Sequence, residues 1–158
     1  MKLHNQFERE LSSIGSGGAA TITVDDRPRT LTCDITERNA LAVSFDRLRL
    51  ATAELAAADA ARLERIGKAL AAKLTYLMEP ICPIEIDADA CVVQLRSNPP
   101  HRDGDDSRSY YELIVRRGGE IALTRYRKEN CGARQPIAAT VTREVLLRLV
   151  GDFCIVLD

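Results

Sequence analysis

The stretch SYYELIVRRGGEIALTRYR, residues 109–127, decides the fold because it has the pattern of a β-hairpin. Its two halves are rich in β-branched and aromatic residues, and Gly118 and Gly119 between them suit the tight turns of hairpins, which require positive φ angles. A two-residue turn at these glycines predicts the register. We expect cross-strand pairs of Arg117 with Glu120, Val115 with Ala122, Leu113 with Thr124 and Tyr111 with Tyr126 on one face, and of Ile114 with Leu123, Glu112 with Arg125 and Tyr110 with Arg127 on the other.

Helices and further strands are predicted on both sides of this hairpin. Leu3, Phe7 and Leu11 fall at helical spacing and predict a short helix over 3–14. The alanine-rich segment 54–77 predicts the main helix, and Thr142 is a suitable N-cap for a final one. The remaining extended segments are 20–36, 37–52, 83–97 and 134–142, with turns expected at Asp26–Pro28, Arg38–Asn39 and Asp46–Arg47 and a break at Asp87–Ala90.

The resulting order of helix, three or four strands, helix, three or four strands and helix predicts an α+β fold. We expect an antiparallel sheet of about six to eight strands, with the middle and C-terminal helices packed on one face, in a single domain over residues 1–158. The halves 1–78 and 79–158 have similar element strings, which suggests a pseudo-repeat. Apolar residues occur on both faces of the hairpin, so we expect a second copy of the chain to cover part of the second face.

The charge of the chain is nearly balanced but unevenly distributed. The net charge is −1, yet Ser107–Arg148 contains nine Lys/Arg and four Asp/Glu and so carries +5, which leaves −6 for the remainder. A near-neutral chain is not typical of proteins that bind nucleic acid or membrane surfaces. The N-terminus has charges where a signal peptide needs an apolar run, and the five cysteines form no close pair. These features predict a cytoplasmic protein with free thiols and no membrane partner.

The polar stretch 97–109 contains His101 and Asp103 but no complete catalytic or metal-binding motif. Its HRDG sequence lacks the leucine and the companion motifs of a protein-kinase catalytic loop, and its aspartates lack the glycine and glutamate of a calcium loop. The two histidines and five cysteines do not have the spacing of zinc ligands. We therefore predict no catalytic residue, metal or cofactor, and we interpret this stretch as a hairpin connector.

Two groups of charged residues are candidate binding sites. Glu85, Asp87 and Asp89 alternate, so on a regular strand they would share a face and could hold a cation, whereas an exposed strand face or turn is the simpler interpretation. The second group is basic and suits an acidic protein or a phosphate. Together with the nearest residues around the connector, it gives the predicted binding set Arg116, Arg125, Arg127, Lys128, Arg134, His101, Asp103 and Tyr111. The predicted register pairs several of these locally and leaves Arg116, Lys128 and Arg134 without partners.

The element order resembles that of the small acidic secretion chaperones of bacteria, which also run helix, strands, helix, strands, helix. This resemblance implies a non-catalytic homodimer that binds an extended segment of a partner protein. The basic C-terminal half departs from the usual acidic surface of that family. Two alternatives stay open. One is a small enzyme or ligand-binding domain with a site under the 97–109 loop, and the other is RNA or phosphate binding through the arginines of the hairpin.

Overall fold

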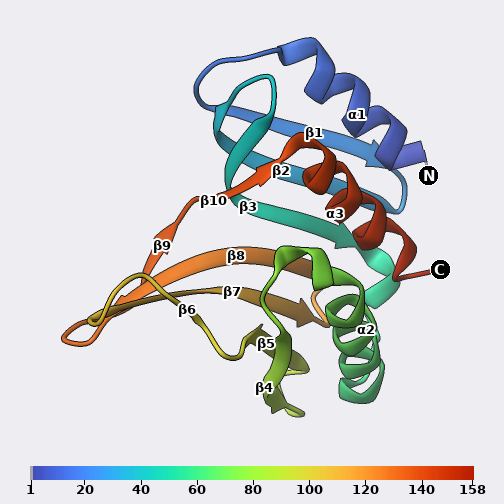
Figure 1. Ribbon diagram of the computed structural model, residues 1–158. Helices are drawn as coiled ribbons and strands as arrows, with labels where there is room; N and C mark the ends of the chain where they lie inside the picture. The colour runs from blue at the N-terminus through green and yellow to red at the C-terminus, as the bar shows by residue number, and fades with distance from the viewer. Residues whose placement is uncertain (1) are drawn as a thin grey trace.

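The computed structural model describes residues 2–158 and shows an α+β fold with three α-helices and one ten-stranded antiparallel sheet (Figure 1). The elements in chain order are α1 (Lys2–Ile14), β1 (Ala20–Asp26), β2 (Arg29–Arg38), β3 (Ala42–Thr52), the 3₁₀ helix η1 (Ala53–Leu55), α2 (Ala60–Lys73), the 3₁₀ helix η2 (Leu74–Leu77), β4 (Ile81–Asp87), β5 (Val92–Ser97), β6 (His101–Arg102), β7 (Ser107–Arg116), β8 (Glu120–Glu129), β9 (Gln135–Ile137), β10 (Ala139–Thr142) and α3 (Arg143–Ile155). The strand count exceeds the prediction because β6 is a very short strand within the connector and because the last extended segment is divided into β9 and β10. The pseudo-repeat remains a prediction.

The sheet has one face covered by helices and one face without them. Its strand order is β1-β2-β3-β8-β7-β5-β4, with β10 paired to β3, β6 to β7 and β9 to β8. Helix α1 packs on β1 and on α3, α3 packs on β3 and β10, and α2 packs on β4, β5 and β7 (Figure 1). Buried side chains from the helices and from alternate strand positions form one apolar cluster on this side. We call the opposite side of the sheet the open face.

Capping residues determine where the helices begin. The predicted helix over 3–14 is confirmed as α1. Thr142 caps α3 as predicted, since its hydroxyl accepts a hydrogen bond at 3.1 Å from a backbone N–H of the first turn. The predicted helix over 54–77 is wrong at its start, because the Asp59 carboxylate accepts a hydrogen bond from the Arg62 backbone N–H at 2.8 Å and α2 begins only after this cap. The flanking residues form the 3₁₀ turns η1 and η2 instead.

The hairpin of β7 and β8 is confirmed, but its predicted register was wrong by one residue. The turn has three residues, Arg117–Gly119, and of its two glycines only Gly119 has a positive φ, at 96°. The Thr52 backbone N–H donates a hydrogen bond to the Gly119 carbonyl at 2.7 Å and so holds the turn against the end of β3. The observed register places the most buried side chains opposite one another, in the pairs Arg116–Glu120, Val115–Ile121, Ile114–Ala122, Leu113–Leu123, Glu112–Thr124, Tyr111–Arg125 and Tyr110–Tyr126.

Strand β3 also differs from the prediction, because it runs unbroken through Asp46–Arg47, where a turn was expected. Its pairing with β2 shifts register between Asp34 and Glu37, so the polar residues here mark a β-bulge and not a reversal of the chain. The predicted break at 87–90 is confirmed, since a turn there separates β4 from β5.

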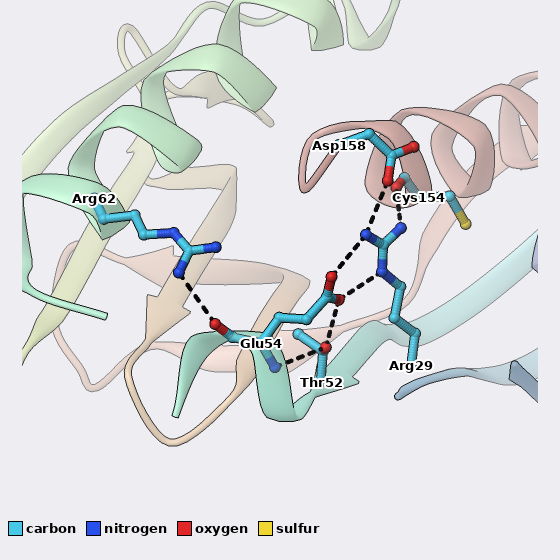
Figure 2. Close-up of polar contacts among 6 residues, drawn as sticks. All are labelled: Arg29, Thr52, Glu54, Arg62, Cys154 and Asp158. Atoms are coloured by element: carbon cyan, nitrogen blue, oxygen red, sulfur yellow. Dashed lines mark hydrogen bonds and ion pairs between the residues drawn. The ribbon is translucent and has the colours of Figure 1, made fainter. Parts of the chain in front are cut away.

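Arg29, at the start of β2, joins this strand to η1 and to the end of α3 (Figure 2). Its guanidinium forms ion pairs with Glu54 at 2.6 Å and with Asp158 at 2.8 Å, and it donates a hydrogen bond to the Cys154 carbonyl at 3.0 Å. The Thr52 hydroxyl donates a further hydrogen bond to Glu54 at 2.8 Å. The hydrogen bond from Arg29 is the main reason that the pKa of Glu54 lies below its usual value. The network thus places a cation at the C-terminal end of a helix, where the free carbonyls favour it.

Candidate anion-binding site

The open face of the sheet is polar and rich in arginine. The even-numbered residues of β7 and β8 point to it, because odd-numbered neighbours such as Leu113 and Leu123 are buried under the helices. The residues of β3 and β5 that pair with these even-numbered residues also point to the open face. The basic side chains on this face are Arg47 and Arg49 from β3, Arg96 from β5, Arg108 and Arg116 from β7, and Lys128 from β8.

Two tyrosines and two arginines form a layered cluster toward one end of this face. Tyr110 and Tyr126 are direct cross-strand neighbours, and their ring centroids lie 6.1 Å apart. The Arg96 guanidinium lies 5.4 Å over the ring of Tyr110, and the Arg134 guanidinium lies 3.9 Å over the ring of Tyr126. The rings of Tyr110 and Tyr126 are therefore covered by arginine side chains of the same chain.

Glu112 anchors Arg134, which comes from the loop between β8 and β9. The Glu112 carboxylate accepts hydrogen bonds from Arg134 and, at 2.9 Å, from the side-chain amide of Gln94. Glu112 is only 4% exposed, so this pairing satisfies a carboxylate that would be costly to bury alone. The hydrogen bond to Glu112 also raises the pKa of Arg134 above its usual value. The pair holds the 130–134 loop beside the end of the sheet.

A cavity of about 620 Å³ opens beside this cluster. Its lining comes from β4, β5, β7 and β8, from the start of the connector and from the 130–134 loop. Its charged and aromatic members are Arg96, Arg108, Tyr110, Lys128 and Arg134. The volume falls within the range of ligand pockets, roughly 300–1,000 Å³. Among the residues that the structure describes, no carboxylate, histidine or cysteine lines the cavity, so it offers hydrogen-bond donors and positive charge.

Three of the four cations that line the cavity form no ion pair within residues 2–158. Within residues 2–158, the side chains of Arg96, Arg108 and Lys128 make no ion pair with a carboxylate, and Arg134 alone is paired. Arg108 and Lys128 also lie directly opposite each other on β7 and β8. Like charges in directly opposite positions destabilise a sheet. An anion bound between them would relieve this repulsion.

Two smaller hollows, of about 250 and 220 Å³, continue the cavity along the open face. Gln94 borders both the cavity and the first hollow, and Arg116 borders both hollows. Beside the second hollow, Arg47 forms an ion pair with Glu120. The pKa of Arg47 nevertheless lies below its usual value, because burial lowers it and the nearby positive charges of Arg49 and Arg116 lower it further. Carboxylates also line the two hollows, Glu85 and Asp87 the first and Glu112 and Glu120 the second, so the excess of positive charge lies at the cavity.

The sheet places three of the predicted binding residues on the open face. Arg116, Lys128 and Arg134 all lie there, and the last two line the cavity. The prediction that all three lack a partner is wrong for Arg134, which pairs with Glu112. Its partner could not be found in the predicted register, because the loop that carries Arg134 folds back over β7.

Three other predicted residues point to the helix-covered side. The Arg125 guanidinium lies 4.4 Å over the ring of Tyr111 and forms an ion pair with Glu79 at 3.0 Å. Burial raises the pKa of Tyr111. Arg127 donates a hydrogen bond to the Ser107 hydroxyl at 2.8 Å. The partners predicted for both arginines were wrong because they followed from the wrong register.

His101 and Asp103 also lie outside the lining of the cavity. β6 places His101 opposite Ser109, and its Nε2 atom is 3.5 Å from the Asp103 carboxylate. The connector borders the cavity instead through its first residues, among them Asn98 and Pro100. The structure therefore brings together the cations of the hairpin and leaves the histidine and its aspartate apart from them.

Of the carboxylates at positions 85, 87 and 89, only Glu85 and Asp87 come together, in the lining of the first smaller hollow. β4 ends at Asp87, and Asp89 lies in the following turn, where its backbone N–H donates a hydrogen bond to the Asp87 side chain at 3.1 Å. In the part of the chain that the structure describes, no group of three or more His, Cys, Asp or Glu side chains could hold a metal ion.

The sequence reasoning missed Arg96, Arg108 and Tyr110. A signal for two of them was present, because Arg108, Tyr110 and Arg116 share one parity along a single strand and must face the same side. Arg96 could be added only with the pairing of β5 to β7, which places it opposite Glu112. Grouping the basic residues by the face of the sheet to which they point would have identified these residues. The prediction grouped the basic residues by their closeness in sequence instead.

Comparisons with protein-family models, with curated proteins and with solved structures found no match. No helix within residues 2–158 is long and apolar enough to cross a membrane.

Proposed function

We propose that this chain is a non-catalytic protein-interaction module that holds an acidic segment of a partner protein along the open face. The observation that carries the proposal is the unneutralised positive charge of Arg96, Arg108 and Lys128 around one cavity. Acidic side chains of a partner would supply the missing counter-charges and speed the encounter. The lining offers cations and amide and hydroxyl groups, which suits binding better than proton transfer or nucleophilic attack.

The shape of the open face favours an extended segment. The cavity and the two hollows follow one another along β7, and Gln94 and Arg116 connect them. A chain in extended conformation places alternate side chains on one side, about 7 Å apart, and could therefore reach successive hollows. The resemblance to secretion chaperones in element order implies the same kind of ligand.

A nucleic acid fits the open face less well. Single-stranded nucleic acid gains affinity by stacking its bases on free aromatic rings. The rings of Tyr110 and Tyr126 are already covered by arginine side chains. The net charge of −1 also gives the chain as a whole little attraction for a polyanion.

Homodimer formation remains a prediction, and we expect it to use another surface. A two-fold axis through the open face would bring Arg108 and Lys128 of one copy close to the same residues of the other. Such a contact of like charges would oppose association, since specific interfaces match opposite potentials.

Fluorescence anisotropy with a labelled peptide of alternating glutamate and serine tests the proposal. We expect the double substitution Arg108→Gln, Lys128→Gln to weaken binding by about tenfold or more, the effect of about 1.4 kcal/mol. The control Arg65→Gln, Lys73→Gln removes the same charge from exposed positions of α2. Equal weakening by both double variants, or no binding of the peptide by the unaltered chain, would refute the proposal.

A further inference from the structure

The cavity carries more positive charge than one carboxylate can neutralise. Arg96, Arg108 and Lys128 lack ion-pair partners among residues 2–158, while Arg134 already has Glu112. A single glutamate or aspartate from a partner would leave two of these charges uncompensated. Acidic side chains on the same side of an extended segment lie about 7 Å apart, so they would spread their charge across the cavity. The site therefore calls for a ligand group that concentrates charge.

A phosphate monoester is such a group. It carries a charge of about −1.5 to −2 near neutral pH and has three strong acceptor oxygens. Guanidinium groups bind it through paired hydrogen bonds, and a lysine ammonium binds it as a point charge. The cavity holds both kinds of cation, and no carboxylate within the described residues lines it to repel the dianion.

The cations are arranged around one position on the sheet. Arg108 and Lys128 are opposite each other, and Tyr110 is the next residue of β7 on the same face. Arg96 reaches over Tyr110 from β5, with its guanidinium 5.4 Å from the ring centroid. The cations thus approach the region beside Tyr110 from three adjacent strands. Stacking on a ring leaves the in-plane N–H groups of a guanidinium available to a ligand.

We propose that this cavity selects a phosphorylated side chain of the partner, so that the module recognises the phosphorylated form of its acidic segment. This inference rests on the proposed function and adds the identity of the group bound in the cavity. The rest of the segment would continue over the two smaller hollows, whose lining contains carboxylates as well as Arg116, so the acidic groups of the segment would concentrate at the cavity. The repulsion between Arg108 and Lys128 in the free protein is relieved when the dianion lies between them.

Three labelled peptides of one acidic sequence, with serine, glutamate or phosphoserine at the central position, test this inference by fluorescence anisotropy. We expect the phosphoserine peptide to bind about tenfold more tightly than the glutamate peptide, because it gains a further charge-assisted hydrogen bond. Arg108→Gln should abolish the difference, whereas Arg65→Gln should preserve it. The advantage of phosphoserine should also fall as the pH decreases through about 6, where the phosphate loses its second charge.

The outcomes separate the two proposals. Equal affinity for the glutamate and phosphoserine peptides, with both weakened by Arg108→Gln, would overturn phosphate selection and leave the acidic-segment proposal intact. Failure of all three peptides to bind would refute both. Binding of vesicles that contain a phosphoinositide, without discrimination among the peptides, would show that the phosphate comes from a lipid and would also overturn the inference. Inorganic phosphate should compete with the phosphoserine peptide and with the glutamate peptide, because both place an anion among the same cations.

Discussion

Alanine at Gly119 should destabilise the fold strongly, although alanine at the adjacent Gly118 should not. A side chain at Gly119 must adopt a φ of 96° and would press its Cβ against the Thr52 carbonyl oxygen. At Gly118 the same Cβ would meet no atom within 4 Å. The two substitutions are chemically identical, so the comparison isolates the backbone geometry of the turn.

The expected magnitude follows from two contributions at Gly119. A left-handed conformation costs a residue with a side chain about 1–2 kcal/mol. The close approach to Thr52 must also displace the turn and weaken the 2.7 Å hydrogen bond that joins it to β3, whose net value is about 0.5–1.5 kcal/mol. The sum is about 1.5–3.5 kcal/mol, which lowers the melting temperature of a chain of this size by roughly 3–14 °C.

Urea denaturation of both variants, with fitted m-values, measures these differences directly. We expect the free energy of unfolding to change by about 0.5 kcal/mol or less for Gly118→Ala. The refuting result is a Gly119→Ala variant as stable as the unaltered chain, or equal damage from both substitutions. Equal damage would favour a two-residue turn with both glycines at positive φ, and with it the register that the sequence first indicated.

Further predictions concern the Arg29 network, the cavity and the thiols. Arg29→Met should lower stability by about 2 kcal/mol in urea denaturation, since charge-assisted hydrogen bonds are lost. Arg29 lowers the pKa of Glu54 in the folded state. The coupling free energy between the two residues, measured by a double-mutant cycle, should therefore be fully present above the pKa of Glu54 in the unfolded chain, about 4.3. It should be lost as the pH falls through the lower pKa of Glu54 in the folded state. Lys128→Glu should stabilise the chain by about 0.5 kcal/mol, because it replaces the cross-strand repulsion from Arg108 by an attraction. The same substitution should abolish peptide binding. A loss of both stability and binding would contradict the role given to Arg108 and Lys128. Exposed Cys131 should react with a thiol reagent in the native protein, whereas Cys33, whose thiol pKa is raised by burial, should react only on unfolding, as mass spectrometry would show.

Local patterns predicted most elements of the fold because each element carries its own signal. The helical spacing of Leu3, Phe7 and Leu11 is sufficient for α1, and Thr142 marks the start of α3. The hairpin was also evident. Its register was missed by one residue because Gly118–Gly119 suits a two-residue turn locally, whereas the end of β3 selects a three-residue turn through a contact distant in sequence.

The candidate site was harder to predict because its residues come from strands far apart in the sequence. Arg96 joins Arg108 and Lys128 only through the pairing of β5 with β7 and of β7 with β8. The predicted basic set combined residues of both faces, and the sheet separates Arg125 from the others by placing it against Glu79. No local pattern contains the information that pairs Arg125 with a residue before β4.

The most direct test of peptide binding on the open face is an NMR titration. The acidic glutamate–serine peptide is added to the labelled protein, and the backbone amides whose chemical shifts change are mapped. We expect the largest changes on the open face, around Arg108, Lys128 and the 130–134 loop, and continuing toward Arg116. Changes confined to the helical side, for example along α2, would contradict binding on the open face.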